Sequence, residues 1–241
     1  MFGKNIKDIN TKKKIKIENN KFYNIQSINS TNDFSYFKLK LKSKVIICID
    51  EINFYFFIAN GSININNKKY DKSNHYFYCN NKAVIQNLKN AEIFILFQRK
   101  KNILNVLKVN SSKEFKYQRR TFKNQINKYW GEISTIFSNS KGACKIIDML
   151  PNTQSSMEFH LNKKENYFIN SGELLLGLRY GKAKQEIIKL KKNDSFFVNV
   201  GVMHMRISKI GTQIIEISNK DSDSDSNIVH NGLTYIFKTI K

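Results

Sequence analysis

Residues able to bind a metal lie close together in the second half of the chain. Glu158, His160 and Asn162 alternate along one segment, and His204 follows further on, in a chain with only four histidines. Side chains on a β-strand alternate between its two faces, so on a strand the three alternating residues would share one face. Imidazole and carboxylate groups that converge inside a barrel hold Zn²⁺, Fe²⁺ or Mn²⁺ with an open coordination position. The residue types therefore indicate a candidate metal site.

Two motifs around these residues carry a family resemblance. The first begins with the segment 156–165 (SMEFHLNKKE) and continues to Gly172. The second is the segment 199–204 (NVGVMH). Together they resemble the two-part signature of the cupin superfamily, in which HxH and Glu precede a later PxGxxH.

The second half is most similar to the cupin domain of the mannose-6-phosphate isomerase type. That domain shows HHHRSEHWxVxxG, then PxGxxH, and then EI or EV followed by an acidic stretch. Here Trp130-Gly131, Glu216-Ile217 and the run 221–226 (DSDSDS) occupy matching places. The resemblance covers roughly residues 129–230, whereas the first half resembles only the bare fold.

The resemblance implies a ligand set and an activity. His160, Glu165 and His204 would hold a divalent metal (Zn, Fe or Mn), with Asn162 at the position of the family's second histidine. The metal would polarise a sugar carbonyl while a base moves a proton between C1 and C2 through an enediol-like state. The expected function is thus a sugar-phosphate isomerase or a related metal-dependent carbohydrate enzyme.

Three further side chains are candidates for catalysis or substrate binding. Glu158 is the extra carboxylate on the His160 face and is our catalytic candidate. Arg179 and Arg206 flank the expected pocket, and a sugar phosphate needs such a cation. Both arginines also fit the alternative of a side chain that extends to solvent at a barrel rim.

Two departures from the motif favour an alternative function. Asn162 replaces a histidine with an amide, which is a weak ligand, and Asn199 replaces the proline of PxGxxH. The alternative is a non-catalytic carbohydrate-binding or regulatory bicupin that has lost its metal, in which His160 and His204 are structural. An iron-dependent dioxygenase-type cupin is a third option. We interpret the run 221–226 as a solvated linker because it lacks the glycine and terminal glutamate of a calcium loop.

The elements that must position these residues are β-strands. Short apolar or alternating runs recur at roughly ten-residue spacing between clusters of Asn, Gly, Lys and Ser, a pattern typical of a sandwich or barrel. The pattern also repeats: residues 54–61 align with 165–172, 76–80 with 195–199, and 91–96 with 212–217. We therefore expect an all-β protein of two cupin-like jelly-roll β-barrels in tandem, with Gly61 equivalent to Gly172.

The expected domains follow from this repeat. They are a basic tail (1–20), a degenerate barrel without metal ligands (21–102), a short, partly helical connector (103–130), a barrel with the metal site (131–220) and a C-terminal segment (221–241). In the first copy, Phe54 takes the place of Glu165 and Ile85 that of His204.

Charge, hydropathy and cysteine content limit the kinds of binding partner that the sequence predicts. The net charge of +22 comes from lysines spread over the whole chain, with five arginines, so we do not expect a dedicated nucleic-acid function. Eighteen consecutive apolar residues do not occur, so no membrane-spanning helix is expected. The three cysteines form no CxxC pair and are expected to be small buried side chains. We expect a cytoplasmic protein that binds a small sugar or sugar phosphate, with a homodimer as one option for its assembly.

Overall fold

A computed structural model gives the fold and describes residues 12–30, 34–42, 45–72, 75–109, 117–122, 124–182 and 185–235. The predicted all-β class is confirmed, because strands make up most of these residues. The helical segments described are two 3-10 turns, η1 (Ile103–Asn105) and η2 (Asp223–Asp225). Within the described residues, no helix has the length and apolar character needed to span a bilayer.

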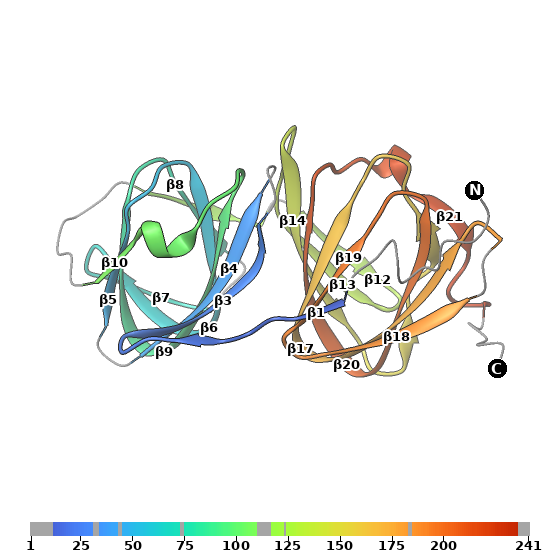
Figure 1. Cartoon of the computed structure of the whole chain (residues 1–241), viewed down its shortest axis with the longest axis horizontal. Helices are drawn as coiled ribbons and strands as arrows, with labels where there is room; N and C mark the ends of the chain where they lie inside the picture. Colours follow the sequence, from blue (N-terminus) through green and yellow to red (C-terminus); the bar gives the residue numbers. More distant parts are fainter. Residues whose placement is uncertain are drawn as a thin grey trace. The chain divides into compact units, whose positions relative to one another are not determined.

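The chain divides into two compact units. The first unit is Ile15–Phe122, and the second unit is Lys123–Lys241 together with the N-terminal strand β1 (Lys12–Lys14) (Figure 1). Each unit contains one large antiparallel sheet and its own apolar core.

The sheet of the second unit is built around the two longest strands, β17 and β20. In spatial order its main strands are β1 (Lys12–Lys14), β19 (Asp194–Val198), β17 (Glu165–Tyr180), β20 (Val202–Ser218), β14 (Gly142–Met149), β13 (Gly131–Asn139) and β12 (Asn124–Lys128). Four shorter strands pair alongside them: β15 (Thr153–Gln154), β16 (Met157–Phe159), β18 (Glu186–Lys191) and β21 (Asn227–His230).

The sheet of the first unit repeats this order. Its main strands are β11 (Gln118–Thr121), β8 (His75–Cys79), β6 (Phe54–Ile65), β9 (Ala83–Phe97), β4 (Ser35–Leu41), β3 (Tyr23–Ser30) and β2 (Glu18–Asn19). Beside them lie β5 (Ile46–Ile49), β7 (Lys68–Asp71) and β10 (Leu107–Val109). β6 therefore corresponds to β17 and β9 to β20, and the pair β5–β10 corresponds to β16–β21.

One pair of equivalent positions, each at an irregularity inside a long strand rather than in the turn expected there, shows why the repeat keeps a glycine. Gly61 and Gly172 have positive φ angles of 72° and 76°. A Cβ at Gly61 would lie 2.1 Å from the carbonyl oxygen of Lys89, and one at Gly172 would lie 2.0 Å from that of Gly211. Both positions need glycine for the same two reasons, the backbone conformation and the close approach of a neighbouring strand.

Strands also occupy the segments expected as tail and connector. β1 lies within the expected basic tail and pairs with β19, where Lys12 forms an ion pair with Asp194 at 2.9 Å. The range 103–130 contains η1 and the strands β10, β11 and β12, so the described part of the expected connector holds one 3-10 turn rather than longer helices. These polar strands were not apparent from the sequence because β11 and β12 are exposed along their whole length.

The cores of the two units differ in polarity. Phe54 and Ile85 are fully buried in the apolar core of the first unit. Their counterparts in the second unit, Glu165 and His204, are equally buried but polar. The second unit therefore uses these two core positions for titratable groups.

Candidate metal centre

Three segments bring the candidate residues together in the second unit. Glu165 is the first residue of β17, and His204 and Arg206 lie two residues apart on β20, where they share a face as expected. Glu158 lies on β16, directly opposite His204 in the antiparallel pairing. The backbone of these four residues is therefore held in place by the hydrogen bonds of the sheet.

Glu165 lies between the two imidazoles. Its carboxylate oxygens are 3.3 Å from Nε2 of His160 and 3.2 Å from Nε2 of His204. The Tyr167 hydroxyl donates to the same carboxylate at 2.5 Å. Glu165 and both histidines are at most 4% exposed, so this cluster is shielded from bulk water.

Both imidazoles present an Nε2 lone pair to the cluster. Nδ1 of His160 lies 2.8 Å from the carbonyl oxygen of Asp225, and Nδ1 of His204 lies 3.0 Å from that of Val202. A carbonyl oxygen can only accept, so each Nδ1 is the donor and each neutral imidazole keeps Nε2 unprotonated. Neither Nε2 has a well-aligned hydrogen-bond partner among the residues that the structure describes.

Two buried cations complete the cluster. The Lys163 ammonium is 2.5 Å from Glu165 and 2.9 Å from Glu216, and it is 7% exposed. The Arg206 guanidinium is 2.6 Å from Glu158 and 3.6 Å from Glu216. Lys163 and Glu216 belong to this cluster, but neither was among the site residues predicted from the sequence.

These contacts set the charge of each group. Burial raises the pKa of Glu165, but Lys163 and the two imidazoles outweigh burial and hold that pKa well below its ordinary value. Burial likewise raises the pKa of Glu158, and Arg206 and His204 outweigh it, so this pKa is also lowered. Burial lowers the pKa of His160, but Glu165 more than compensates and the net shift is upward. Both carboxylates are therefore ionised at neutral pH.

Asn162 is not directed into the cluster. β16 ends at Phe159, so residues 160–164 do not continue the alternation on which the expectation rested. The Asn162 side chain is exposed and donates to the Asp225 carboxylate at 3.2 Å.

Arg179 also lies apart from the cluster. Its Nε donates to the carbonyl of Gly181 at 3.1 Å, and its side chain does not line the cavity at the cluster. Its β-sheet partner is Met203, one residue before His204, so Arg179 lies in register with the opposite face of β20. Of the two expected substrate-binding arginines, only Arg206 reaches the cavity.

The run 221–226 is not simply a solvated linker. Asp225 is 5% exposed, and its carboxylate accepts hydrogen bonds from the backbone N–H groups of Leu161, Asn162 and Lys163. Asp221 is paired with Lys145 at 2.6 Å. The alternation of Asp and Ser does not predict these contacts, because they depend on how the segment after β20 packs against residues far away in the sequence.

A cavity of about 400 Å³ opens onto the cluster. Glu158, His160, Glu165 and Arg206 line its depth, and the remaining lining includes Tyr129, Trp130, Lys128, Asp223 and Ile228. The Arg206 guanidinium lies over the Trp130 ring, 5.6 Å from its centroid. The cavity therefore gives a small molecule access to the carboxylates and to the His160 imidazole.

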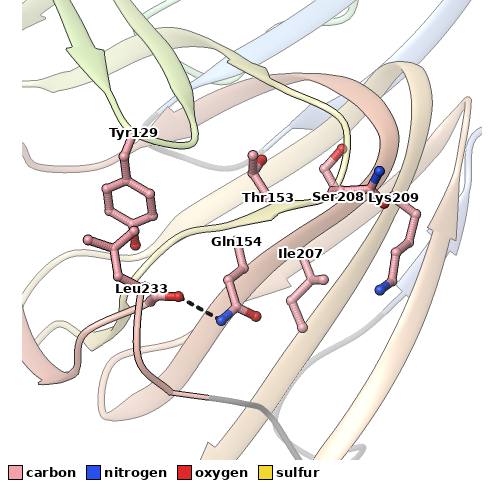
Figure 2. Close-up of a pocket in the computed structure, with 9 residues that line it drawn as sticks. Tyr129, Thr153, Gln154, Ile207, Ser208, Lys209 and Leu233 are labelled. Carbon is pink, nitrogen blue, oxygen red and sulfur yellow. Dashed lines mark hydrogen bonds between the residues drawn. The ribbon is translucent and has the colours of Figure 1, made fainter.

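A second cavity of about 400 Å³ in the same unit lacks such groups. Figure 2 shows its lining, which includes Tyr129, Thr153, Gln154 and Leu233. The Gln154 amide donates to the carbonyl of Gly232 at 2.7 Å, and the Thr153 hydroxyl donates to that of Leu150 at 2.7 Å. Because these polar groups are already bonded within the protein, the first cavity is the candidate functional site.

The residues at the first cavity fit a divalent metal. Glu158, His160 and His204 offer ligand atoms within 4.8 Å of one another, and Glu165 lies within 3.3 Å of both imidazoles. Two ligands of a tetrahedral ion bound at 2.0–2.2 Å lie about 3.3–3.6 Å apart, which agrees with the spacing around Glu165. Two Nε2 lone pairs that face an ionised carboxylate require a proton or a metal ion between them. The expectation of a divalent-metal site is thus confirmed by the donor set.

Comparisons with known proteins support the same assignment. The family described as mannose-6-phosphate isomerase C-terminal matches residues 114–230. No curated protein sequence matches the chain significantly.

Solved structures of Bacillus subtilis oxalate decarboxylase share the fold. Two mutants of that enzyme each have a TM-score of 0.66, with 12% and 11% identity, and cover 88% and 87% of this chain and 77% of their own. A third structure, described with its Mn(II) centers, has a TM-score of 0.66, 12% identity and the same coverage as the first. The motifs, the strand order and these matches agree: the chain has a cupin-like fold, and its second half resembles the C-terminal domain of mannose-6-phosphate isomerases.

Proposed function

We propose that the second unit is a metal-dependent cupin enzyme that isomerises a small sugar or sugar phosphate. The observation that carries this proposal is the pair of buried Nε2 atoms of His160 and His204, which face Glu165 at the base of a cavity. In this proposal His160, Glu165 and His204 hold the ion, which when bound would polarise a substrate carbonyl oxygen.

Glu158 is the proposed proton acceptor. It is ionised, lines the cavity and has 16% of its side chain exposed, so it can meet a substrate that Glu165 cannot. Arg206 at 2.6 Å and the Ser226 hydroxyl orient its two oxygens. Glu158 would remove the proton from the carbon beside the carbonyl and return it to the carbonyl carbon, while the hydroxyl proton of the first carbon passes to the carbonyl oxygen.

Lys163 and Arg206 would keep the carboxylates of the site ionised, as proton transfer and metal binding require. They pair with three carboxylates, Glu158, Glu165 and Glu216, so the excess negative charge is small. A buried carboxylate without such a partner would take up a proton and lose its basicity. The two cations therefore support the proposed roles of Glu158 and Glu165.

A proton-exchange experiment tests the proposal. Mannose 6-phosphate, fructose 6-phosphate and the free sugars are incubated with Mn²⁺-loaded protein in D₂O, and NMR follows loss of the proton signal at C2 of each aldose and at C1 of each ketose. We expect exchange with wild type, none with Glu158→Gln, and wild-type Mn²⁺ affinity in that variant. Metal binding without exchange on any of these sugars would refute the isomerase, and loss of metal from Glu158→Gln would show that Glu158 is a ligand.

Lys163 favours a second candidate function. Its ammonium already contacts two carboxylates of the cluster, so it supplies positive charge where a metal otherwise would. The corresponding function is a metal-free carbohydrate-binding or regulatory bicupin. Metal analysis of protein purified without a tag distinguishes the two functions.

We also propose that each sheet closes into a jelly-roll barrel, so that two cupin barrels lie in tandem along the chain. The repeated strand order and the equivalent glycines Gly61 and Gly172 support this arrangement. The division at Ile15 and Lys123 supports domain boundaries close to those expected, with β1 added to the second unit.

A further inference from the structure

His160 is the ligand candidate that the sheet does not hold. β16 ends one residue before it, whereas His204 lies within β20 and bonds the carbonyl of Val202 on its own strand. The Nδ1 partner of His160 is instead the carbonyl of Asp225, 65 residues further along the chain. The orientation of His160 therefore depends on the segment that contains Asp225.

The Asp225 side chain ties that segment to the loop after β16. Oδ1 accepts from the N–H of Leu161 at 2.9 Å and of Asn162 at 3.2 Å. Oδ2 accepts from the N–H of Asn162 at 3.1 Å and of Lys163 at 2.8 Å. Three successive N–H groups that follow His160 thus point at one carboxylate, much as they do at a capped helix end.

The side-chain carboxylate and the backbone carbonyl of Asp225 both bond the same short loop. The carboxylate fixes the backbone of residues 161–163, and the carbonyl oxygen accepts from Nδ1 of His160. A hydrogen bond from Nδ1 to a carbonyl places the single proton of the neutral ring on Nδ1 and leaves Nε2 as the free ligand atom. The loop also carries Lys163, the partner of Glu165.

We propose that Asp225 is a positioning residue of the metal centre, which sets the tautomer and orientation of His160 and so raises the affinity of the site for a divalent metal. The effect on affinity rests on the proposed function, whereas the effect on the tautomer does not. Removing a group that orients a metal-binding histidine typically lowers metal affinity about 10–100-fold.

Two variants and one control test this role. Asp225→Ala removes all the side-chain acceptors. Asp225→Asn keeps the shape but turns an NH₂ group toward N–H donors, so we expect a smaller effect in the same direction. Asp148→Ala is the charge-matched control, because Asp148 is an exposed aspartate of the same unit that bonds Gln213 and does not line the cavity at the cluster.

The first readout is the tautomer of His160 in metal-free protein. Long-range ¹⁵N–¹H NMR at alkaline pH, above the raised pKa of His160, reports which ring nitrogen is protonated, and a His160→Gln sample assigns the signals. We expect protonated Nδ1 in wild type and in Asp148→Ala, and a mixture of tautomers in Asp225→Ala and Asp225→Asn. An unchanged tautomer in the folded variants would overturn the proposal. If Asp225→Ala does not fold, the tautomer of His160 in Asp225→Asn gives the decisive result.

The second readout is calorimetric titration with Mn²⁺. We expect about 10–100-fold weaker binding by Asp225→Ala, a smaller loss for Asp225→Asn and no change for Asp148→Ala. Equal affinity in wild type and both Asp225 variants would overturn the effect on the metal. If wild type binds no Mn²⁺, the proposed function fails, while the NMR result still decides the role of Asp225.

Discussion

Replacing Lys163 with methionine tests the charge balance of the site. The variant keeps an unbranched side chain of similar length but leaves Glu165 and Glu216 without their contacts at 2.5 and 2.9 Å. Removing one partner of a buried ion pair costs about 3–5 kcal/mol, because the remaining charge stays buried and unpaired. Lys163 is 7% exposed and Glu165 1% exposed, so solvent cannot compensate, and we expect a loss in this range.

The assay uses the single tryptophan of the chain. Trp130 is 4% exposed and lies in the core of the second unit, so its fluorescence reports unfolding of the unit that carries the site. Urea titrations of metal-free protein give the free energy of unfolding from the midpoint and slope. Lys164→Met is the matched control, because Lys164 is exposed, and we expect a change within about 0.5 kcal/mol.

Added Mn²⁺ extends the test. A metal that binds the folded state stabilises it in proportion to the logarithm of its concentration. With Lys163 removed, Glu165 and Glu216 lose the ammonium group that they share and attract a cation more strongly, so Mn²⁺ should stabilise Lys163→Met more than wild type. A metal-free Lys163→Met protein within about 1 kcal/mol of wild type would refute the reasoning, because Lys163 would then not balance the buried carboxylates.

Two further predictions concern stability away from the cluster. Burial raises the pKa of Glu51, but Lys101 and the other partners of Glu51 outweigh burial, so the net shift is downward. Glu51 therefore stabilises the first unit at pH values above its unfolded pKa of about 4.3, and this contribution is lost as the pH falls through its folded pKa. Glu51→Gln should therefore cost about 1–2 kcal/mol at neutral pH and nothing in strong acid, as measured by urea titrations across pH with circular dichroism; a difference that persists in acid would contradict this. Gly172→Ala should destabilise the second unit by at least about 2 kcal/mol, because its Cβ would meet the carbonyl of Gly211 at 2.0 Å. Gly181→Ala has the same positive-φ strain but open space, so the Trp fluorescence assay should show a smaller loss, and equal losses would count against the close contact.

The strand pattern and the repeat could be predicted from the sequence because both depend on local alternation. Gly61 and Gly172 occupy equivalent positions within β6 and β17, and Phe54 and Ile85 occupy the core positions that correspond to Glu165 and His204. Burial of alternate residues imposes this pattern directly on the chain. The polar strands β11 and β12 lack it, and they were therefore not predicted.

The candidate site could be predicted only where its residues lie on strands. His204 and Arg206 share a face because β20 is continuous, whereas Asn162 lies beyond the end of β16 and period two does not apply. Lys163 and Asp225 act through contacts between segments far apart in the chain, and a lysine or aspartate in a polar run gives no local sign of burial. Such contacts depend on tertiary structure rather than on spacing.

Metal analysis of the purified protein tests the central claim most directly. The full chain is prepared without an affinity tag, incubated with Mn²⁺ or Zn²⁺ and freed of unbound ions, and its metal content is measured by elemental analysis for wild type and His204→Ala. We predict about one ion per chain for wild type, and none for His204→Ala, which removes one of the two imidazole ligands. A folded wild-type protein that retains neither metal, or a His204→Ala protein that retains as much as wild type, would contradict a metal centre at His160, Glu165 and His204.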